Sequence, residues 1–151
     1  MIALVQRVTS SSVAINNVIK NQISGLGLLI FLCITKNDSE KDVNILYNKI
    51  SNFRIFADNQ KKMNLSIKDI NGSIMIVSQF TLCGNTDNGR RPSFERAAKP
   101  VVAKKLYNYF INMFKRNNFI VKGGEFGKDM DISLVNTGPS TFYFNTDEND
   151  K

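Results

Sequence analysis

The chain has 151 residues, of which 42% are hydrophobic and 22% charged, and its formal net charge is +7. These values exclude a disordered chain and suit one domain with a real core, residues 1–151, whose acidic tail is expected to be frayed from about residue 146. The positive excess fits a polyanionic partner such as nucleic acid, and fits a merely basic surface equally well. No apolar run is long enough to predict a membrane helix, and Met1–Arg7 is too short for a signal peptide, so we expect a cytoplasmic protein.

The sequence contains no histidine and two cysteines, Cys33 and Cys83. Without histidine the chain cannot build a Ser-His-Asp triad, a Cys-His pair or a histidine-ligated zinc site. No CxxC motif offers a thiolate metal site or a redox pair. We therefore expect two buried, reduced thiols, no metal site and no cofactor. A thiol enzyme that used Cys83 would lack a base.

The first half of the chain predicts a hairpin, a central strand and a helix. Residues 2–8 and 12–15 have strand patterns, and Asn16-Asn17 is a turn from which residues 19–23 return. Residues 28–34 are apolar on both faces, which is typical of a strand inside a two-layer core. Ser39 and Asp42 form a capping-box pattern, and the stripe that follows predicts an amphipathic helix: Val43, Leu46, Tyr47, Ile50 and Phe53.

The second half predicts further strands around a second helix. Residues 54–56 and 74–82 have strand patterns, and a polar loop over 84–93 follows them. Arg90 and Arg91 in this loop favour contact with phosphate, although a plain solvated loop is the alternative. Pro100 opens a helix whose predicted buried stripe is Val102, Leu106, Tyr109, Phe110, Met113 and Phe114. Strands are predicted over 119–122, 132–135 and 141–144.

Polar residues follow two of these strands, at Ser78–Leu82 and at Asn136–Thr141. Backbone N–H groups at a strand end can stabilise an oxyanion without any titratable side chain. A threonine hydroxyl is a poor nucleophile without a base, and the usual base is missing here. On spacing alone, these polar residues could simply satisfy the end of a sheet. Gly138-Pro139 could be a plain turn, with its bond cis or trans.

The chain resembles the D-aminoacyl-tRNA deacylases, also called D-tyrosyl-tRNA deacylases, along nearly its whole length. The matching segments are Val5–Val8, Arg54–Phe56, Lys62–Ser66, Val77–Leu82, Arg91–Phe94, Phe126–Met130 and Ser133–Pro139. The resemblance implies an α/β protein of three-layer α/β/β type, with mixed sheets and two main helices, that forms a homodimer. It also implies hydrolysis of D-aminoacyl-tRNA, and of glycyl-tRNA mischarged on alanine tRNA, with rejection of L-aminoacyl esters.

The same resemblance assigns the catalytic residues as Gln79, Phe80 and Thr81, which line the site for the aminoacyl ester. Our hypothesis is that water attacks the ester carbonyl. The backbone N–H groups of Phe80 and Thr81 then serve as oxyanion donors, and the terminal ribose 2′-hydroxyl assists. The rival hypothesis is that Thr81 is a covalent nucleophile. A protein on the same fold that binds tRNA without turnover is the alternative from another functional class, and only turnover separates the two.

The remaining residues implied by the resemblance bind the substrate or shape its pocket. Ser78 lines the site, and Phe126 and Met130 pack on the terminal adenine. Gly138-Pro139 is held cis and inserts into the partner subunit's site as the chiral filter, and Arg7 braces it across the interface. Two positions depart from the usual pattern: Ser140 stands where valine is common, and Cys83 where an aromatic or apolar residue is common.

Overall fold

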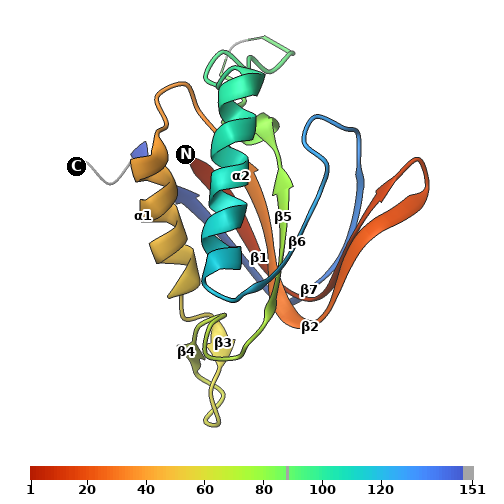
Figure 1. The fold of residues 1–151 in the computed structure, drawn as a ribbon, viewed down its shortest axis with the longest axis vertical. Coiled ribbons are helices and arrows are strands. Elements are labelled where there is room, and N and C mark those ends of the chain that lie inside the picture. Colours follow the sequence, from red (N-terminus) through yellow and green to blue (C-terminus); the bar gives the residue numbers. More distant parts are fainter. Residues whose placement is uncertain (88, 148–151) are drawn as a thin grey trace.

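The computed structural model describes residues 1–87 and 89–147 of the chain (Figure 1). Two helices and a five-stranded sheet dominate it, so the predicted mixed α/β class is confirmed. The elements are β1 (Ile2–Ile15), β2 (Val18–Cys33), α1 (Glu40–Ser51), β3 (Phe56–Ala57), β4 (Met63–Leu65), β5 (Ser73–Ser78), the 3-10 turn η1 (Phe80–Cys83), α2 (Pro100–Arg116), β6 (Ile120–Gly123) and β7 (Asp131–Asn145).

The sheet is mixed, with the strand order β6-β5-β2-β1-β7. β1 is antiparallel to both β2 and β7, whereas β5 is parallel to β2 and to β6. β3 and β4 form a separate two-stranded ribbon. The buried parallel strand β5 reads as a continuous apolar run, Ile74–Val77, which is typical of a strand covered on both faces.

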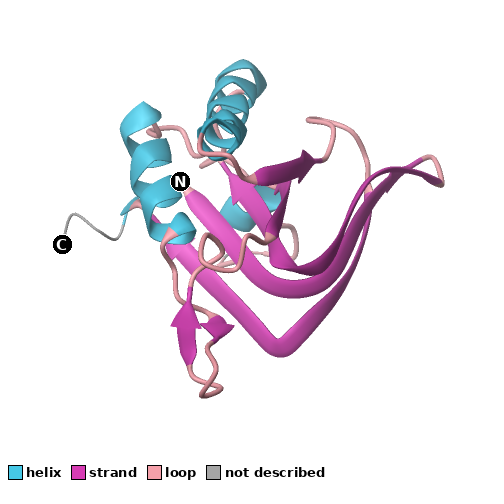
Figure 2. Ribbon diagram, turned by 60° about the horizontal axis from the view of Figure 1, so that its bottom comes forward, coloured by secondary structure: helices cyan, strands magenta, loops and turns pink. Residues whose placement is uncertain are grey.

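β1 and β2 are each longer than predicted. The turn at Asn16-Asn17 is confirmed, and both residues have positive φ (51° and 61°), as the tightest hairpin turns require. The predicted breaks within the two strands are instead a bulge, at which the register shifts between Val8 and Ser10 and Gly25 takes a φ of +83°. Bulges bend a strand pair, and beyond this one the hairpin curls away from the helices (Figure 2).

Both faces of the sheet carry a core cluster. Figure 1 shows α1 and α2 side by side over one face, and the larger cluster lies between them and the sheet. The smaller cluster lies on the other face, where Val13, Ile23 and Leu134 from the curled parts of the long strands pack with Leu29 and Val77. The bend therefore lets the curled part of the sheet cover the face that the helices leave open.

The helices begin as predicted. The Ser39 amide donates to the Asp42 carboxylate at 2.9 Å, which confirms the capping box of α1. The buried stripe of α2 differs from the prediction at two positions, because Val102 is 45% exposed whereas Tyr107 is 3% exposed.

Two short strands are shifted from their predicted positions. The strand predicted over 54–56 lies at Phe56–Ala57, and the one over 119–122 lies at Ile120–Gly123. In the described part of the chain, no helix is long and apolar enough to cross a membrane.

β7 is a single strand rather than two strands around a break. Thr141 pairs with Gln6 and Asn136 pairs with Val8, so residues 137–140 bulge out opposite Arg7. The tail expected to be frayed is held at its start, since the amide of buried Thr146 donates to the Met1 carbonyl at 2.9 Å. Residues 148–151 of that prediction lie outside the described residues.

Candidate active site

A cleft of about 830 Å³ opens where β2 and β5 end. The first turn of α2 forms one wall, and the connection from β6 to β7 forms another. The cleft brings together most of the residues predicted to act on the ester or to bind the terminal adenosine: Ser78, Gln79, Phe80, Thr81, Phe126 and Met130. These residues lie up to 52 positions apart in the chain, so the fold and not the sequence order assembles them.

Two residues of η1 that line this cleft, Phe80 and Thr81, have backbone amides without a partner among the described residues. The Gln79 amide donates to the Leu32 carbonyl at 2.8 Å and completes the β2–β5 pairing. The chain then turns, with the Leu82 amide bonded to the Gln79 carbonyl at 3.3 Å. The first N–H groups of a helical turn have no acceptor inside the turn. Within the described chain, the amides of Phe80 and Thr81 donate to no other residue, so both are available to an oxyanion.

The side chains of the turn offer no base. The Gln79 side-chain amide donates to the Thr81 hydroxyl, and an amide cannot accept the proton that a threonine nucleophile would lose. Phe80 is 57% exposed and meets Phe94 edge to face, with ring centroids 5.0 Å apart. The geometry therefore favours main-chain stabilisation of a charged intermediate over an activated side chain.

The Gly138-Pro139 loop lies outside this cleft. Its peptide bond is cis, and both residues are exposed. Arg7 braces the loop of its own chain, because Nε donates to the Thr137 carbonyl at 3.0 Å while Nη1 reaches the Ile55 carbonyl. Arg7 thus holds the loop within one chain, and its expected contact across an interface stays a prediction. Asn136 closes the bulge by accepting from the Ser140 amide at 2.7 Å.

A family model described as D-Tyr-tRNA(Tyr) deacylase matches residues 4–145. The chain belongs to the D-Tyr-tRNA(Tyr) deacylase family. A curated D-aminoacyl-tRNA deacylase of Thermodesulfovibrio yellowstonii is 51% identical over 146 residues, which are 97% of this chain and 99% of the relative. One of Escherichia coli O1:K1 / APEC is 43% identical over 143 residues, with 95% and 98% covered.

Two solved structures are similar in fold. The c-Myc DNA Unwinding Element Binding Protein superposes with a TM-score of 0.90 at 33% identity, and the match covers 97% of this chain and 99% of that one. A structure described as a probable eukaryotic D-amino acid tRNA deacylase has a TM-score of 0.81 at 18% identity, with 95% and 97% covered. The family model and the curated relatives confirm the predicted resemblance to the deacylases.

The deacylase-family cleft also contains Tyr107, an aromatic residue to which the sequence analysis assigned no role. Tyr107 of α2 lines the cleft, its hydroxyl donates to the Ile76 carbonyl at 2.8 Å, and its ring lies 5.7 Å from that of Phe126. Burial raises the pKa of Tyr107 to about 12, so the hydroxyl stays protonated and keeps this bond. Its spacing of three from Phe110 could have placed it on the buried stripe.

Lys99 and Lys128 also line the cleft. Both are exposed, and no ion pair of either lysine is found in the described chain. Asp129 is the carboxylate beside them. The cleft thus has mainly apolar walls and two exposed cations. This arrangement suits a ligand with an apolar body and an anionic end.

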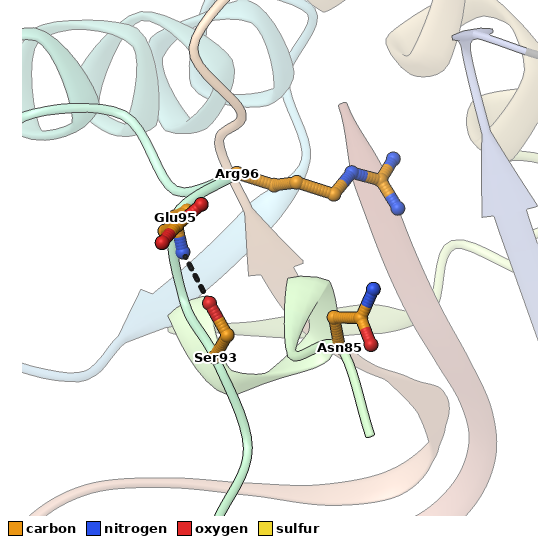
Figure 3. A pocket seen from close by; sticks show the side chains of 4 residues that line it. All are labelled: Asn85, Ser93, Glu95 and Arg96. Carbon is orange, nitrogen blue, oxygen red and sulfur yellow. Dashed lines mark hydrogen bonds between the residues drawn. The ribbon is translucent and has the colours of Figure 1, made fainter. Parts of the chain in front are cut away.

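A smaller hollow of about 240 Å³ lies at the base of the 84–99 loop (Figure 3). Backbone bonds between Asn85 and Ser93 close the loop at 2.8 and 2.9 Å, and the Glu95 amide lies 3.5 Å from the Ser93 hydroxyl. The Arg96 side chain extends away from that contact and pairs with Asp147 at 3.5 Å. The described residues contain no cluster of three or more potential metal ligands.

Proposed function

We propose that this protein hydrolyses the ester bond that joins a D-amino acid to the 3′ end of tRNA. Water adds to the ester carbonyl, the acyl–oxygen bond breaks, and the ribose oxygen leaves with a proton, so free tRNA and the D-amino acid are released. The observation that carries the proposal is the pair of unpartnered amides at Phe80 and Thr81 in the cleft of a deacylase-family chain.

These two amides serve as the oxyanion donors. Preorganised N–H groups stabilise the charge that develops on the carbonyl oxygen, and they need no titratable side chain. An aminoacyl ester is more reactive than a peptide, so this stabilisation suffices where a protease would need a base. The neighbouring ribose hydroxyl of the substrate assists the proton transfer.

The catalytic set proposed from the resemblance also contains Gln79 and the Thr81 side chain. Gln79 orients the Thr81 hydroxyl through its amide donor, which supports a positioning role for both side chains. We therefore favour water as the nucleophile. If Thr81→Ala abolished turnover while tRNA binding stayed intact, covalent catalysis by Thr81 would replace this mechanism.

The terminal adenosine binds in the apolar part of the cleft. The volume of the cleft, about 830 Å³, lies within the usual range of ligand pockets, roughly 300–1,000 Å³. Phe126 and Met130 offer an aromatic and a thioether surface for the adenine ring, and Ser78 offers a hydroxyl nearby. The tRNA phosphates then meet Lys99, Lys128 and the loop that carries Arg90 and Arg91.

The chiral filter comes from a second copy of the chain. Gly138 and Pro139 are exposed and lie outside the cleft of their own chain, which supports insertion of the loop into the partner subunit's cleft in a homodimer. A filter that acts by clash rejects an L side chain and admits a D side chain. It also admits glycine, so glycyl-tRNA mischarged on alanine tRNA is a second substrate.

We assign this activity to one domain, residues 1–151, acting in the cytoplasm. The two free thiols, Cys33 and Cys83, are typical of a reducing compartment. A second candidate function is nucleic-acid binding without turnover. The net charge of +7 and the likeness to the c-Myc DNA Unwinding Element Binding Protein favour it.

Deacylation assays separate the two functions. The purified protein is incubated with D-tyrosyl-, L-tyrosyl- and glycyl-tRNA beside a variant that carries both Gly138→Ala and Pro139→Ala, and spontaneous hydrolysis without protein is the baseline. We expect rapid loss of the D-tyrosyl and glycyl esters, survival of the L-tyrosyl ester, and loss of this selectivity in the variant. Binding of tRNA without turnover of any ester would leave only the second candidate.

A further inference from the structure

Two buried thiols lie behind the η1 turn. Cys33, at the end of β2, is 0% exposed, and Cys83, at the end of η1, is 2% exposed. Both are free, and both donate to the Phe80 carbonyl oxygen, at 3.5 Å from Cys33 and 3.0 Å from Cys83. They share a small apolar cluster with Ile2. Side chains from two separate elements therefore hold one carbonyl group.

That carbonyl belongs to the same peptide unit as the Thr81 amide. In a trans peptide the C=O and N–H groups point in opposite directions, and the cis bond of the described chain lies elsewhere, at Gly138-Pro139. Because the Phe80 carbonyl is turned toward the buried thiols, the Thr81 N–H is turned away from them. The exposed residue Thr81 lines the cleft on that outer side.

Rotation of this peptide plane would have two costs. The Thr81 N–H would face two sulfur atoms, which are weak acceptors, and would be left poorly bonded in a buried place. The Phe80 carbonyl oxygen would then point into the cleft, where it would repel an oxyanion. One orientation of the peptide thus supports the chemistry, and the two thiols add to the 3-10 bonding of η1 in stabilising that orientation.

We propose that Cys33 and Cys83 are positioning residues for ester hydrolysis, which aim the Thr81 amide into the cleft by holding the Phe80 carbonyl. The inference rests on the proposed function, since it needs the Thr81 amide to face the ester. It also assigns a role to Cys83, which does not line the cleft itself.

A thiol must keep its proton to act as a donor. Burial, and next the adjacent Cys83, raise the pKa of Cys33 to about 12. The thiol is therefore protonated at neutral pH. A buried thiol of high pKa is also a poor nucleophile, so the same environment that suits the positioning role disfavours direct attack by sulfur.

Serine and alanine variants separate positioning from simple packing. Serine keeps a hydrogen-bond donor in nearly the same volume, whereas alanine removes both the sulfur atom and the donor. We compare Cys33→Ser/Cys83→Ser with Cys33→Ala/Cys83→Ala, and use Ile2→Val as the control that loosens the same cluster without changing either donor. The measurements are kcat and KM for D-tyrosyl-tRNA, together with the Tm of each variant.

We expect the alanine pair to lower kcat at least tenfold with KM within twofold, since loss of an oxyanion donor costs about 10²–10³ in kcat. The serine pair should stay within threefold of the parent kcat, and Ile2→Val should lower Tm alone. Equal losses of kcat in the serine and alanine pairs, or no loss in the alanine pair, would overturn the inference. The proposed function would still stand as long as the parent protein hydrolyses the ester. A parent protein without turnover would overturn both.

The single variants Cys83→Ala and Cys83→Ser cover the case in which a double variant does not fold, because Cys83 makes the shorter hydrogen bond. Their kcat values should differ in the same direction. A crystal structure of Cys83→Ala gives a readout independent of activity: a rotated or mixed Phe80–Thr81 peptide supports the inference, and an unchanged peptide together with unchanged kcat refutes it.

Discussion

Gly138 is confined by two side chains of its own chain. A Cβ at this position would lie 2.6 Å from Arg7 Nη2 and 2.6 Å from Ser140 Oγ, and its φ is +127°, where L residues are rarely found. Arg7 also holds the Thr137 carbonyl at 3.0 Å, so a displaced Arg7 would release the residue that precedes the glycine. The shape of the proposed filter therefore depends on the missing side chain at Gly138.

We expect Gly138→Ala to destabilise the protein and to weaken the rejection of L-aminoacyl esters. Backbone strain of this kind costs about 1–3 kcal/mol, which corresponds to a Tm lower by roughly 2–12 °C for a chain of this size. Calorimetry and L-tyrosyl-tRNA hydrolysis measure the two effects. Gly25→Ala is the matched control, because its φ is also positive (+83°) but nothing lies within 4 Å of the added Cβ. An unaltered L-ester rate in Gly138→Ala would contradict the role of the loop.

Sequence patterns predicted which helices and strands exist better than they predicted the full length of the long strands. The two helices and the Asn16-Asn17 hairpin follow from local rules, namely caps, apolar spacing and residues that tolerate positive φ. The unbroken strands β1, β2 and β7 do not follow, because bulges interrupt the alternation that a strand pattern relies on. Such interruptions look like loops until the pairing partner is known.

The candidate site shows the same limit. The polar end of β5 and the Gly-Pro pair could be selected from the sequence, and the family resemblance gave them roles. Tyr107 and the contact of Cys33 with Phe80 could not be selected, because they join elements 31 and 47 residues apart in the chain. Only the folded arrangement of β2, β5 and α2 brings these groups together.

The start of α1 gives a prediction at the scale of one element. The Asp42 carboxylate accepts from the Ser39 amide at 2.9 Å and from its hydroxyl at 2.8 Å. Burial alone would raise the pKa of Asp42, but the hydrogen bonds from Ser39 outweigh burial and hold it below its ordinary value of 3.8. The folded state therefore binds this proton less tightly than the unfolded chain. The resulting stability is present above pH 3.8 and is lost as the pH falls through the folded-state pKa.

We expect Asp42→Asn to lower the free energy of unfolding at pH 7 by about 0.5–1.5 kcal/mol, the usual net worth of a hydrogen bond. The difference from the parent should shrink as the pH falls below about 4. Urea unfolding at pH 7, 4 and 3 measures it. Asp131→Asn removes the same charge from an exposed strand position and should have little effect. A difference that stayed constant from pH 7 to 3 would show that the carboxylate is not responsible.

The whole molecule is basic, but the positive charge has to be near the cleft to act on tRNA. Figure 1 shows the loop before α2 at one end of the molecule and the β3–β4 ribbon at the other. Lys99 and Lys128 line the cleft itself, with Asp129 as the nearby carboxylate. Lys62 directly precedes β4 of that ribbon and carries the same charge. This separation lets local binding of phosphate be distinguished from the effect of net charge.

We expect the double variant Lys99→Gln/Lys128→Gln to lower kcat/KM for D-tyrosyl-tRNA several-fold at low salt. Each lysine–phosphate ion pair that the substitutions remove should also reduce the slope of log(kcat/KM) against log[salt] by about 1. Hydrolysis of D-tyrosyl-adenosine, which has no phosphate, should be unchanged, because the amides of Phe80 and Thr81 are untouched. Lys62→Gln, the charge-matched control, should leave the slope nearly as it is. Equal changes in slope per charge removed at both ends would mean that tRNA senses the total charge of the protein, and the lysines at the cleft would then have no specific role in binding phosphate.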